Sequence, residues 1–250
     1  MVKDIVNKAW NLTFPVMVKK LDKNVFLFTF QHEADLNSAF RHRPWTLRGA
    51  YLNLKVWEPE LNWNEVDFSS STFWIQIHGL PFMWQNKPNL TKIGNKLGKF
   101  LEADFFGEFL PQRCRFVRIK VEVDVSAPFK PGMFLPRTNL NDVWIGLKYE
   151  KMPEICYKCG LIGHGISGCN SSTIYIVNPF GNNIPAFGPW LRFDNEDYPP
   201  YDVPQPSVEE LNPAKTADTQ PLSCQSDPRP PPATVGTCAM PTKNKMFCTQ

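Results

Sequence analysis

The sequence lacks the short motifs by which many enzymes and membrane proteins are recognised. It contains no P-loop, no Gly-x-Gly-x-x-Gly, His-Glu-x-x-His or Gly-x-Ser-x-Gly pattern, and no carboxylate cluster typical of a reverse transcriptase or nuclease. No apolar run approaches the length of a membrane span, and the first ten residues have no signal-peptide apolar region. These absences predict an intracellular protein of the nucleus or cytoplasm that is not an enzyme and has no membrane partner.

Disulfide spacing and a strong charge bias are also missing. Four of the 7 Cys, namely Cys114, Cys224, Cys238 and Cys248, show no disulfide spacing, which fits a reducing compartment. The net charge is +3, with 22 Lys and Arg against 16 Asp and Glu in residues 1–170 and 5 against 8 in residues 171–250. The basic excess lies where a phosphate-binding surface would need it, but an ordinary globular domain has a similar excess. Charge alone therefore identifies no partner.

What the sequence does contain is a set of ligands with metal-binding spacing. The spacing is Cys-x2-Cys-x4-His-x4-Cys, and the four residues are Cys156, Cys159, His164 and Cys169. Three thiolates and one imidazole complete the tetrahedral shell that Zn²⁺ prefers in a structural site, with no position left for water or substrate. The motif predicts one Zn²⁺ per chain that stabilises structure and does not catalyse.

Two glycines between the ligands support this interpretation. Gly160 follows the second ligand, where the chain must turn tightly over the metal, and Gly163 precedes His164, where we expect a side chain to crowd the imidazole. A segment of this length cannot bury a core of its own, so we expect the metal to supply its folding energy.

The run from Cys156 to Cys169 resembles a retroviral-type zinc knuckle, a module that binds single-stranded nucleic acid. The resemblance implies that Tyr157 and Ile166 are the residues on which bases stack, with Lys158 as the charge inside the loop. An alternative stays open, because the neighbouring loop residues are uncharged. In that alternative the apolar face of the knuckle docks a protein and the Pro-rich tail recruits another.

Periodicity in the first 60 residues predicts an α-β-β-α-β order. The expected helices are 2–10 and 33–40, and the expected strands are 16–20, 25–30 and 51–57. This order is a ferredoxin-like unit without its first strand, and the third strand and second helix resemble those of an RNA-recognition motif. Alternation places Phe26, Phe28 and Phe30 on the core side, where they are not available for base stacking.

A second α/β set follows in residues 72–150. We expect a strand from Thr72 that leads into a turn at Pro81, a helix at 90–97, and strands at 100–105, 115–125 and 143–148. In the long strand Val117, Ile119 and Val121 occupy one face, so the basic residues occupy the other. We predict phosphate contacts from this face and from the approach to the knuckle, although a solvated sheet face is the simpler alternative. The candidates are Arg113, Arg115, Arg118, Lys120, Lys148 and Lys151.

Together these stretches resemble the plant family called domain of unknown function 4283, joined to its zinc knuckle. The resemblance covers about residues 1–170 and is carried by residues 26–30, 43–45, 56–59, 73–81, 93–98, 115–123 and 149–156. It implies binding of RNA or single-stranded DNA, as in the first open reading frame of plant LINE-type retroelements and their domesticated relatives. It also implies that a strand precedes the first helix, so either the protein extends upstream of Met1 or another strand fills the gap.

The predicted organisation has five parts. They are a truncated ferredoxin-like half (1–60), the second α/β half of the same domain (72–150), the knuckle (154–170), a loosely ordered aromatic segment (171–197) and a disordered Pro-rich tail (198–250). The tail holds 11 of the 24 Pro and loses apolar periodicity, which is the basis for expecting disorder and a contact site for protein partners.

Overall fold

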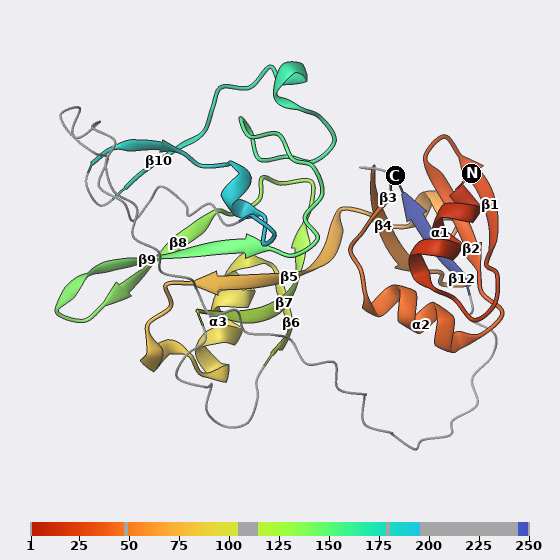
Figure 1. The fold of residues 1–250 in the computed structure, drawn as a ribbon, viewed down its shortest axis with the longest axis horizontal. Coiled ribbons are helices and arrows are strands. Elements are labelled where there is room, and N and C mark those ends of the chain that lie inside the picture. The colour runs from red at the N-terminus through yellow and green to blue at the C-terminus, as the bar shows by residue number, and fades with distance from the viewer. Residues whose placement is uncertain (1, 48–49, 105–114, 179–180, 196–244, 250) are drawn as a thin grey trace, which may run out of the picture.

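The computed structural model describes residues 2–47, 50–104, 115–178, 181–195 and 245–249, and within them the fold is mixed α+β and mostly antiparallel (Figure 1). In these ranges the strands form two five-stranded sheets and one two-stranded sheet. Each large sheet has its own cluster of buried apolar residues. The two α/β sets are thus separate sheets, each with its own core, and their grouping as halves of one domain stays a prediction.

The first unit has the strand order β1-β2-β12-β4-β3. Its elements are α1 (Val2–Trp10), β1 (Met17–Asp22), β2 (Val25–Thr29), α2 (Glu33–Arg41), β3 (Trp45–Leu47), β4 (Ala50–Val56) and β12 (Lys245–Thr249). The predicted helices and the strands β1, β2 and β4 are present. The central strand β12 comes from the far end of the sequence and lies between β2 and β4 (Figure 1).

The core of the first unit lies between this sheet and the helices α1 and α2. Phe26, Phe28 and Phe30 are all buried there, so the predicted orientation of the strand is confirmed. Trp10 of α1 packs edge-on against Phe28, with ring centroids 5.0 Å apart, and stacks on Phe30 at 5.6 Å. Alternation along β2 leaves Val25 on the opposite face, where it is half-buried.

The second unit has the strand order β6-β7-β5-β9-β8. Its elements are β5 (Ser70–His78), α3 (Lys87–Leu97), β6 (Lys99–Ala103), β7 (Phe116–Asp124), β8 (Gly132–Arg137) and β9 (Leu140–Tyr149), with short 3₁₀ turns at Trp63–Glu65 and Phe82–Trp84 before and after β5. Helix α3 begins three residues before the predicted start. Its first turn is polar and shows no apolar period, but the Asn86 side chain caps it by accepting from the Asn89 N–H at 3.0 Å.

The core of the second unit is continuous across the sheet and α3. Val117, Ile119 and Val121 of β7 are buried, which confirms the predicted face of this strand. Leu90 and Ile93 of α3 pack against it. In the part of the chain that the structure describes, no helix is both long enough and apolar enough to cross a membrane.

Residues 171–197 were expected to be loosely ordered, and their described part is instead folded onto the second unit. It forms β10 (Tyr175–Val177), β11 (Asn183–Pro185) and a 3₁₀ turn at Pro189–Leu191. Ile184, Phe187 and Leu191 are buried. Local sequence could not predict this order, because these apolar residues are held by contacts with distant strands and not by a local period.

The disordered tail predicted for 198–250 lies outside the described residues over 198–244. Its end does not fit the prediction, because residues 245–249 form β12. The gap in the first sheet is therefore filled by another strand of this chain, which is one of the two outcomes that the sequence left open.

The face of β4 that points away from the first core contacts the second unit. The Tyr51 ring stacks on Phe73, and the Asn53 amide donates to the Phe68 and Ser70 carbonyls at 2.8 and 3.1 Å. Lys55 Nζ lies 3.3 Å from Glu122 Oε1. Because successive side chains of β4 point to opposite faces, one face contributes apolar residues to the first core and the other face contacts the second unit.

Glu122 makes this interface sensitive to pH. Burial alone would raise the pKa of Glu122, but the Ser70 hydroxyl, which donates to it at 2.8 Å, and the charge of Lys55 hold its pKa below the ordinary value of 4.5. A carboxylate whose pKa is lower in the folded state stabilises the fold above its unfolded pKa, and this contribution is lost as the pH falls through the folded pKa.

We expect Glu122→Gln to lower stability by about 1 kcal/mol at neutral pH, because it weakens a partly exposed ion pair. The difference in stability between the variant and the unmodified protein should shrink as the pH falls below 4.5, since the Glu122 carboxylate then becomes protonated and is as uncharged as the Gln amide. Urea unfolding at several pH values measures this, with Glu58→Gln at an exposed position as the control. A difference that stays constant down to pH 3 would contradict the assignment.

Candidate metal centre

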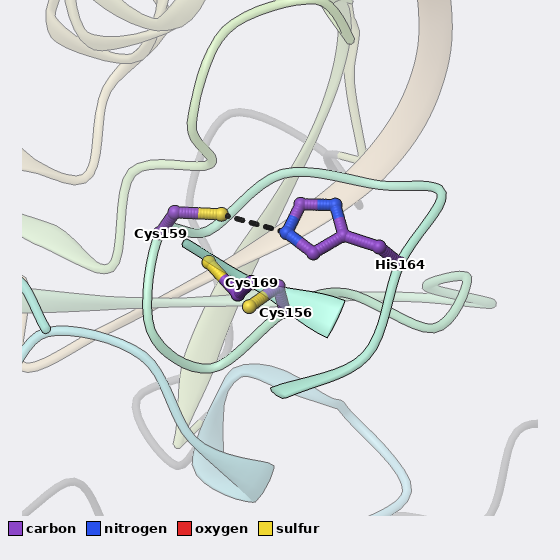
Figure 2. A group of neighbouring side chains, drawn as sticks. All are labelled: Cys156, Cys159, His164 and Cys169. Carbon is purple, nitrogen blue, oxygen red and sulfur yellow. Dashed lines mark hydrogen bonds between the residues drawn. The ribbon is translucent and has the colours of Figure 1, made fainter. Parts of the chain in front are cut away.

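The four predicted ligands meet in one loop that follows β9 (Figure 2). Their ligand atoms all lie within 4.8 Å of one another, and Cys159 Sγ is 3.3 Å from His164 Nε2. A tetrahedral Zn²⁺ with bonds of about 2.3 Å to sulfur and about 2.0 Å to nitrogen holds its ligand atoms roughly 3.5–3.8 Å apart. The cluster of Cys156, Cys159, His164 and Cys169 is therefore placed to hold one zinc ion.

Backbone hydrogen bonds shape the first half of the loop. The Cys156 N–H donates to the Leu161 carbonyl at 2.9 Å, and the Gly160 N–H donates to the Cys156 carbonyl at 2.8 Å. Gly160 has φ +76°, as expected for a tight turn after the second ligand. Gly163 also has a positive φ, of +98°, but a Cβ there would meet no atom within 4 Å. Backbone conformation, and not the expected crowding of the imidazole, is thus the reason for this second glycine.

The loop is supported by the core of the second unit. Cys156 and Cys159 are buried, and the Phe129 N–H donates to the Gly160 carbonyl at 3.1 Å. The Phe187 ring lies against Gly160, where a Cβ would come within 2.3 Å of it. The first half of the knuckle therefore belongs to a larger packed unit, and we expect zinc to order mainly the exposed second half, from residue 163 to residue 169.

The thiols differ in how readily they ionise. Burial would raise the pKa of Cys156, but hydrogen bonds from the Cys159 and Lys158 backbone N–H groups outweigh it and lower the pKa to about 7. Burial raises the pKa of Cys159, and the neighbouring thiols Cys156 and Cys169 add to this effect. Cys156 is thus ready to bind metal as a thiolate near neutral pH, whereas Cys159 needs the charge of the metal to lose its proton.

A cleft of about 1370 Å³ opens beside the metal ligands. One wall is the knuckle, with Tyr157, His164 and Ile166, and another is β4, with Tyr51 and Asn53. Both predicted stacking residues therefore line the same cleft. Tyr157 is half-buried and Ile166 is 49% exposed. Lys158, which follows Tyr157 in the chain, is half-exposed.

The predicted basic residues near the knuckle have partners within the protein. Lys148 Nζ donates to the Asn195 carbonyl at 2.7 Å. Lys151 Nζ donates to the His42 carbonyl at 2.9 Å and lies 5.0 Å from the centre of the Trp45 ring. Both lysines therefore join separate parts of the chain.

The predicted basic patch on β7 carries ion pairs. Arg118 bridges Asp104 at 3.1 Å and Glu150 at 2.9 Å. Lys120 pairs with Glu102 at 2.9 Å. Arg115 is exposed at the start of the strand, and Arg113 lies outside the described residues. The acidic neighbours neutralise much of this patch, and phosphate contact by these residues stays a prediction.

The β4 wall of the cleft and Arg192 were not among the predicted site residues. Arg192 lines the cleft, donates to the Pro153 carbonyl at 3.4 Å and lies 3.6 Å from Asp194. Nothing in the local sequence connects Tyr51 or Arg192 to the knuckle, because chain folding over a long separation brings them there.

We expect one zinc per chain by metal analysis of reduced protein. Cys159→Ser combined with Cys169→Ser should abolish binding because it removes two of four ligands, whereas Cys224→Ser outside the motif should leave it unchanged. Chelation should increase hydrogen exchange in residues 163–169 and leave β5 and β7 protected, since none of residues 163–169 belongs to the core of these strands. Zinc content that the double substitution does not change would contradict the ligand assignment.

Comparisons with known proteins agree with this organisation. Residues 1–65 match the family described as Domain of unknown function (DUF4283), and residues 123–171 match the family described as Zinc knuckle. The chain is 24% identical over 138 residues to the Arabidopsis thaliana protein named Uncharacterized protein At4g02000, a stretch that covers 54% of this chain and 42% of that relative. No solved structure matches the chain. Residues 1–65 are thus similar to the DUF4283 family, and residues 123–171 are similar to the zinc knuckle family.

Proposed function

We propose that the protein binds single-stranded nucleic acid, RNA or DNA, in the cleft between its zinc knuckle and β4, and that it is not an enzyme. The observation that carries this proposal is that Tyr157 and Ile166 line one cleft directly beside the metal ligands. Four protein ligands saturate a tetrahedral zinc, so the metal holds the loop and has no open position for a reacting water.

The size and lining of the cleft support a nucleic-acid chain as ligand. Small-molecule pockets have volumes of about 300–1,000 Å³, and this cleft is larger. Single-stranded nucleic acids are held by stacking of unpaired bases on aromatic and apolar side chains. Tyr157 supplies an aromatic ring and Ile166 an exposed apolar surface.

The charge available for phosphate contacts is modest. The candidates are Arg192, which lines the cleft, and Lys158, which follows the lining residue Tyr157 in the chain. Arg118 and Lys120 would have to exchange carboxylate partners for phosphates, so their net gain is small. We therefore expect a binding free energy in which stacking dominates and the salt dependence is shallow.

The topology of the sheets and the presence of the knuckle also support proposals about the fold class, the origin and the cellular compartment of the protein. We propose that the first unit is ferredoxin-like, because its central strand is antiparallel to both neighbours and its order matches that topology when β12 is counted first. We propose that the second unit is a variant of the same topology, with β8 between β7 and β9 in sequence, where the second helix would stand. The pairing of a DUF4283 region with a knuckle supports descent from a retroelement. A reducing intracellular compartment would keep the knuckle thiols available for zinc.

One observation favours a second candidate, a protein-interaction module. Glu154 and Arg192 both line the cleft, so its charge is mixed and not basic, and Ile162 and Ile166 give it an apolar rim. A protein segment would find both apolar contact and paired charges there. Salt dependence separates the two candidates, because phosphate contacts release counterions and apolar docking does not.

We expect Tyr157→Ala to weaken binding of a single-stranded oligonucleotide by about 5- to 150-fold, since stacking contributes about 1–3 kcal/mol per base. Zinc content should be unchanged, because Tyr157 is not a ligand. Tyr157→Phe is the matched control and should bind normally, as it keeps the ring. Fluorescence anisotropy measures the affinities. Binding that survives Tyr157→Ala in the zinc-loaded protein would contradict the stacking role.

We expect Lys158→Ala to flatten the plot of log affinity against log salt concentration by roughly 0.7, the value for one phosphate contact on a single strand. Lys120→Ala should change this slope less, because Lys120 is paired with Glu102. Oligonucleotide titrations between 50 and 300 mM salt test this on both variants. A slope of zero for the unmodified protein would favour the protein-interaction module instead.

A further inference from the structure

The first sheet is completed by a strand from a remote part of the chain. Within the described residues β1 pairs with β2 and β3 pairs with β4, and the two pairs are joined through β12. β12 is antiparallel to both neighbours, with Cys248 opposite Phe26 on one side and opposite Leu54 on the other. β2 and β4 therefore form the two sides of a groove that β12 occupies.

The second sheet shows which strand would ordinarily fill this position. Its order β6-β7-β5-β9-β8 parallels β1-β2-β12-β4-β3, with an edge hairpin on each side of a central strand. There the central strand is β5, which directly precedes helix α3 in sequence and is antiparallel to both neighbours. In the first unit the equivalent position, before α1, is taken by β12 with the same antiparallel pairing to both neighbours.

The side chain described on β12 fits the first core. Cys248 has no exposed surface and belongs to the cluster that contains Phe26, Phe28 and Leu54. Burial raises the pKa of its thiol, and a hydrogen bond from the Phe26 backbone opposes this rise only in part. A strand shifted by one residue would turn Cys248 out of the core, so the burial of this residue specifies the register.

Removing β12 would leave β2 and β4 with unpaired backbone groups at the middle of the sheet. An isolated two-stranded hairpin is marginally stable in water, and an unpaired edge is a template for another strand. The first unit thus depends on an occupant for the groove.

We propose that the groove between β2 and β4 is a strand-binding site whose occupant is the segment Lys245–Thr249 of the same chain. The site binds by backbone pairing on both sides and by burial of Cys248, and it accepts the same sequence as a separate peptide. This proposal does not depend on the proposed nucleic-acid function.

The same chain is the favoured source of the strand for a physical reason. The 49 residues between Asn195 and Lys245 can span up to roughly 160 Å. A covalent connection raises the local concentration of the segment and makes its binding independent of protein concentration.

The first experiment uses Cys248→Asp in the full chain and measures hydrogen exchange. Because an unpaired charge is costly in a core, the strand should leave the groove, and amides of β2 and β4 should exchange at least 10-fold faster. Amides of β5 and the zinc content should stay unchanged, which distinguishes release of the strand from general unfolding. Cys238→Asp, outside the strand, is the matched control and should leave β2 and β4 protected.

Unchanged exchange of β2 and β4 in Cys248→Asp would overturn the proposal. A second measurement keeps it testable if the variant folds poorly. In the unmodified protein, Cys248 should react with iodoacetamide at least 10-fold more slowly under native conditions than in urea, and the gain in reactivity should parallel the loss of protection in β2. Equal reactivity of Cys248 under native and unfolding conditions would also overturn it.

The peptide arm tests the groove directly. An excess of a synthetic peptide of residues 243–250 should restore the protection of β2 and β4 in Cys248→Asp, whereas the same peptide carrying Asp in place of Cys should not. Failure of the native peptide to restore protection would overturn the claim of a strand-binding site. Protection that depends on protein concentration in the unmodified chain would overturn the same-chain assignment and identify a second copy as donor.

Discussion

Each large sheet has one central strand, β12 in the first unit and β5 in the second. The backbone N–H and C=O groups of these two strands must be paired on both sides, and the rest of each unit depends on this requirement. In the second unit β5 meets it with β7 and β9, which are its neighbours in the same contiguous stretch of chain. In the first unit β12 meets it with β2 and β4. Because a buried unpaired backbone group is costly, neither core can close until its central strand is in place.

The zinc knuckle packs against the second unit and is not an independent module on a linker. Strand β9 leads directly into it, and the later stretches 174–178 and 181–195 pack beside it and place Phe187 against Gly160. The buried half of the loop is thus positioned by packing, while the exposed half depends on metal ligands for its shape. This division explains how a loop with few residues can present Tyr157 and Ile166 in a defined arrangement.

Charge in this protein is used mainly within the fold. Arg118 and Lys120 lie over Trp74 and pair with carboxylates, and Lys55 joins the two units through Glu122. The same residues counted from sequence would suggest a basic surface. Their ion pairs neutralise much of that charge, and the cleft itself is lined by both Glu154 and Arg192. The nucleic-acid binding that we propose would therefore rely on stacking more than on a long-range electrostatic field.

The sequence by itself determined the features that depend on local spacing. These are the four zinc ligands, the core-facing side of β2 at Phe28, the core-facing side of β7 at Ile119, and the helices α1 and α2, all of which the structure confirms. Ligand spacing and strand alternation depend on residues that are neighbours in sequence, so both can be predicted without knowledge of the tertiary structure.

Only the tertiary structure decided which residues far apart in the chain meet. It placed Lys245–Thr249 in the first sheet, folded Phe187 onto the knuckle, and brought Tyr51 and Arg192 to the cleft beside Ile166. It also paired the basic residues of β7 with Asp104, Glu102 and Glu150. Such contacts depend on the simultaneous packing of many elements, and no local pattern in the sequence encodes them.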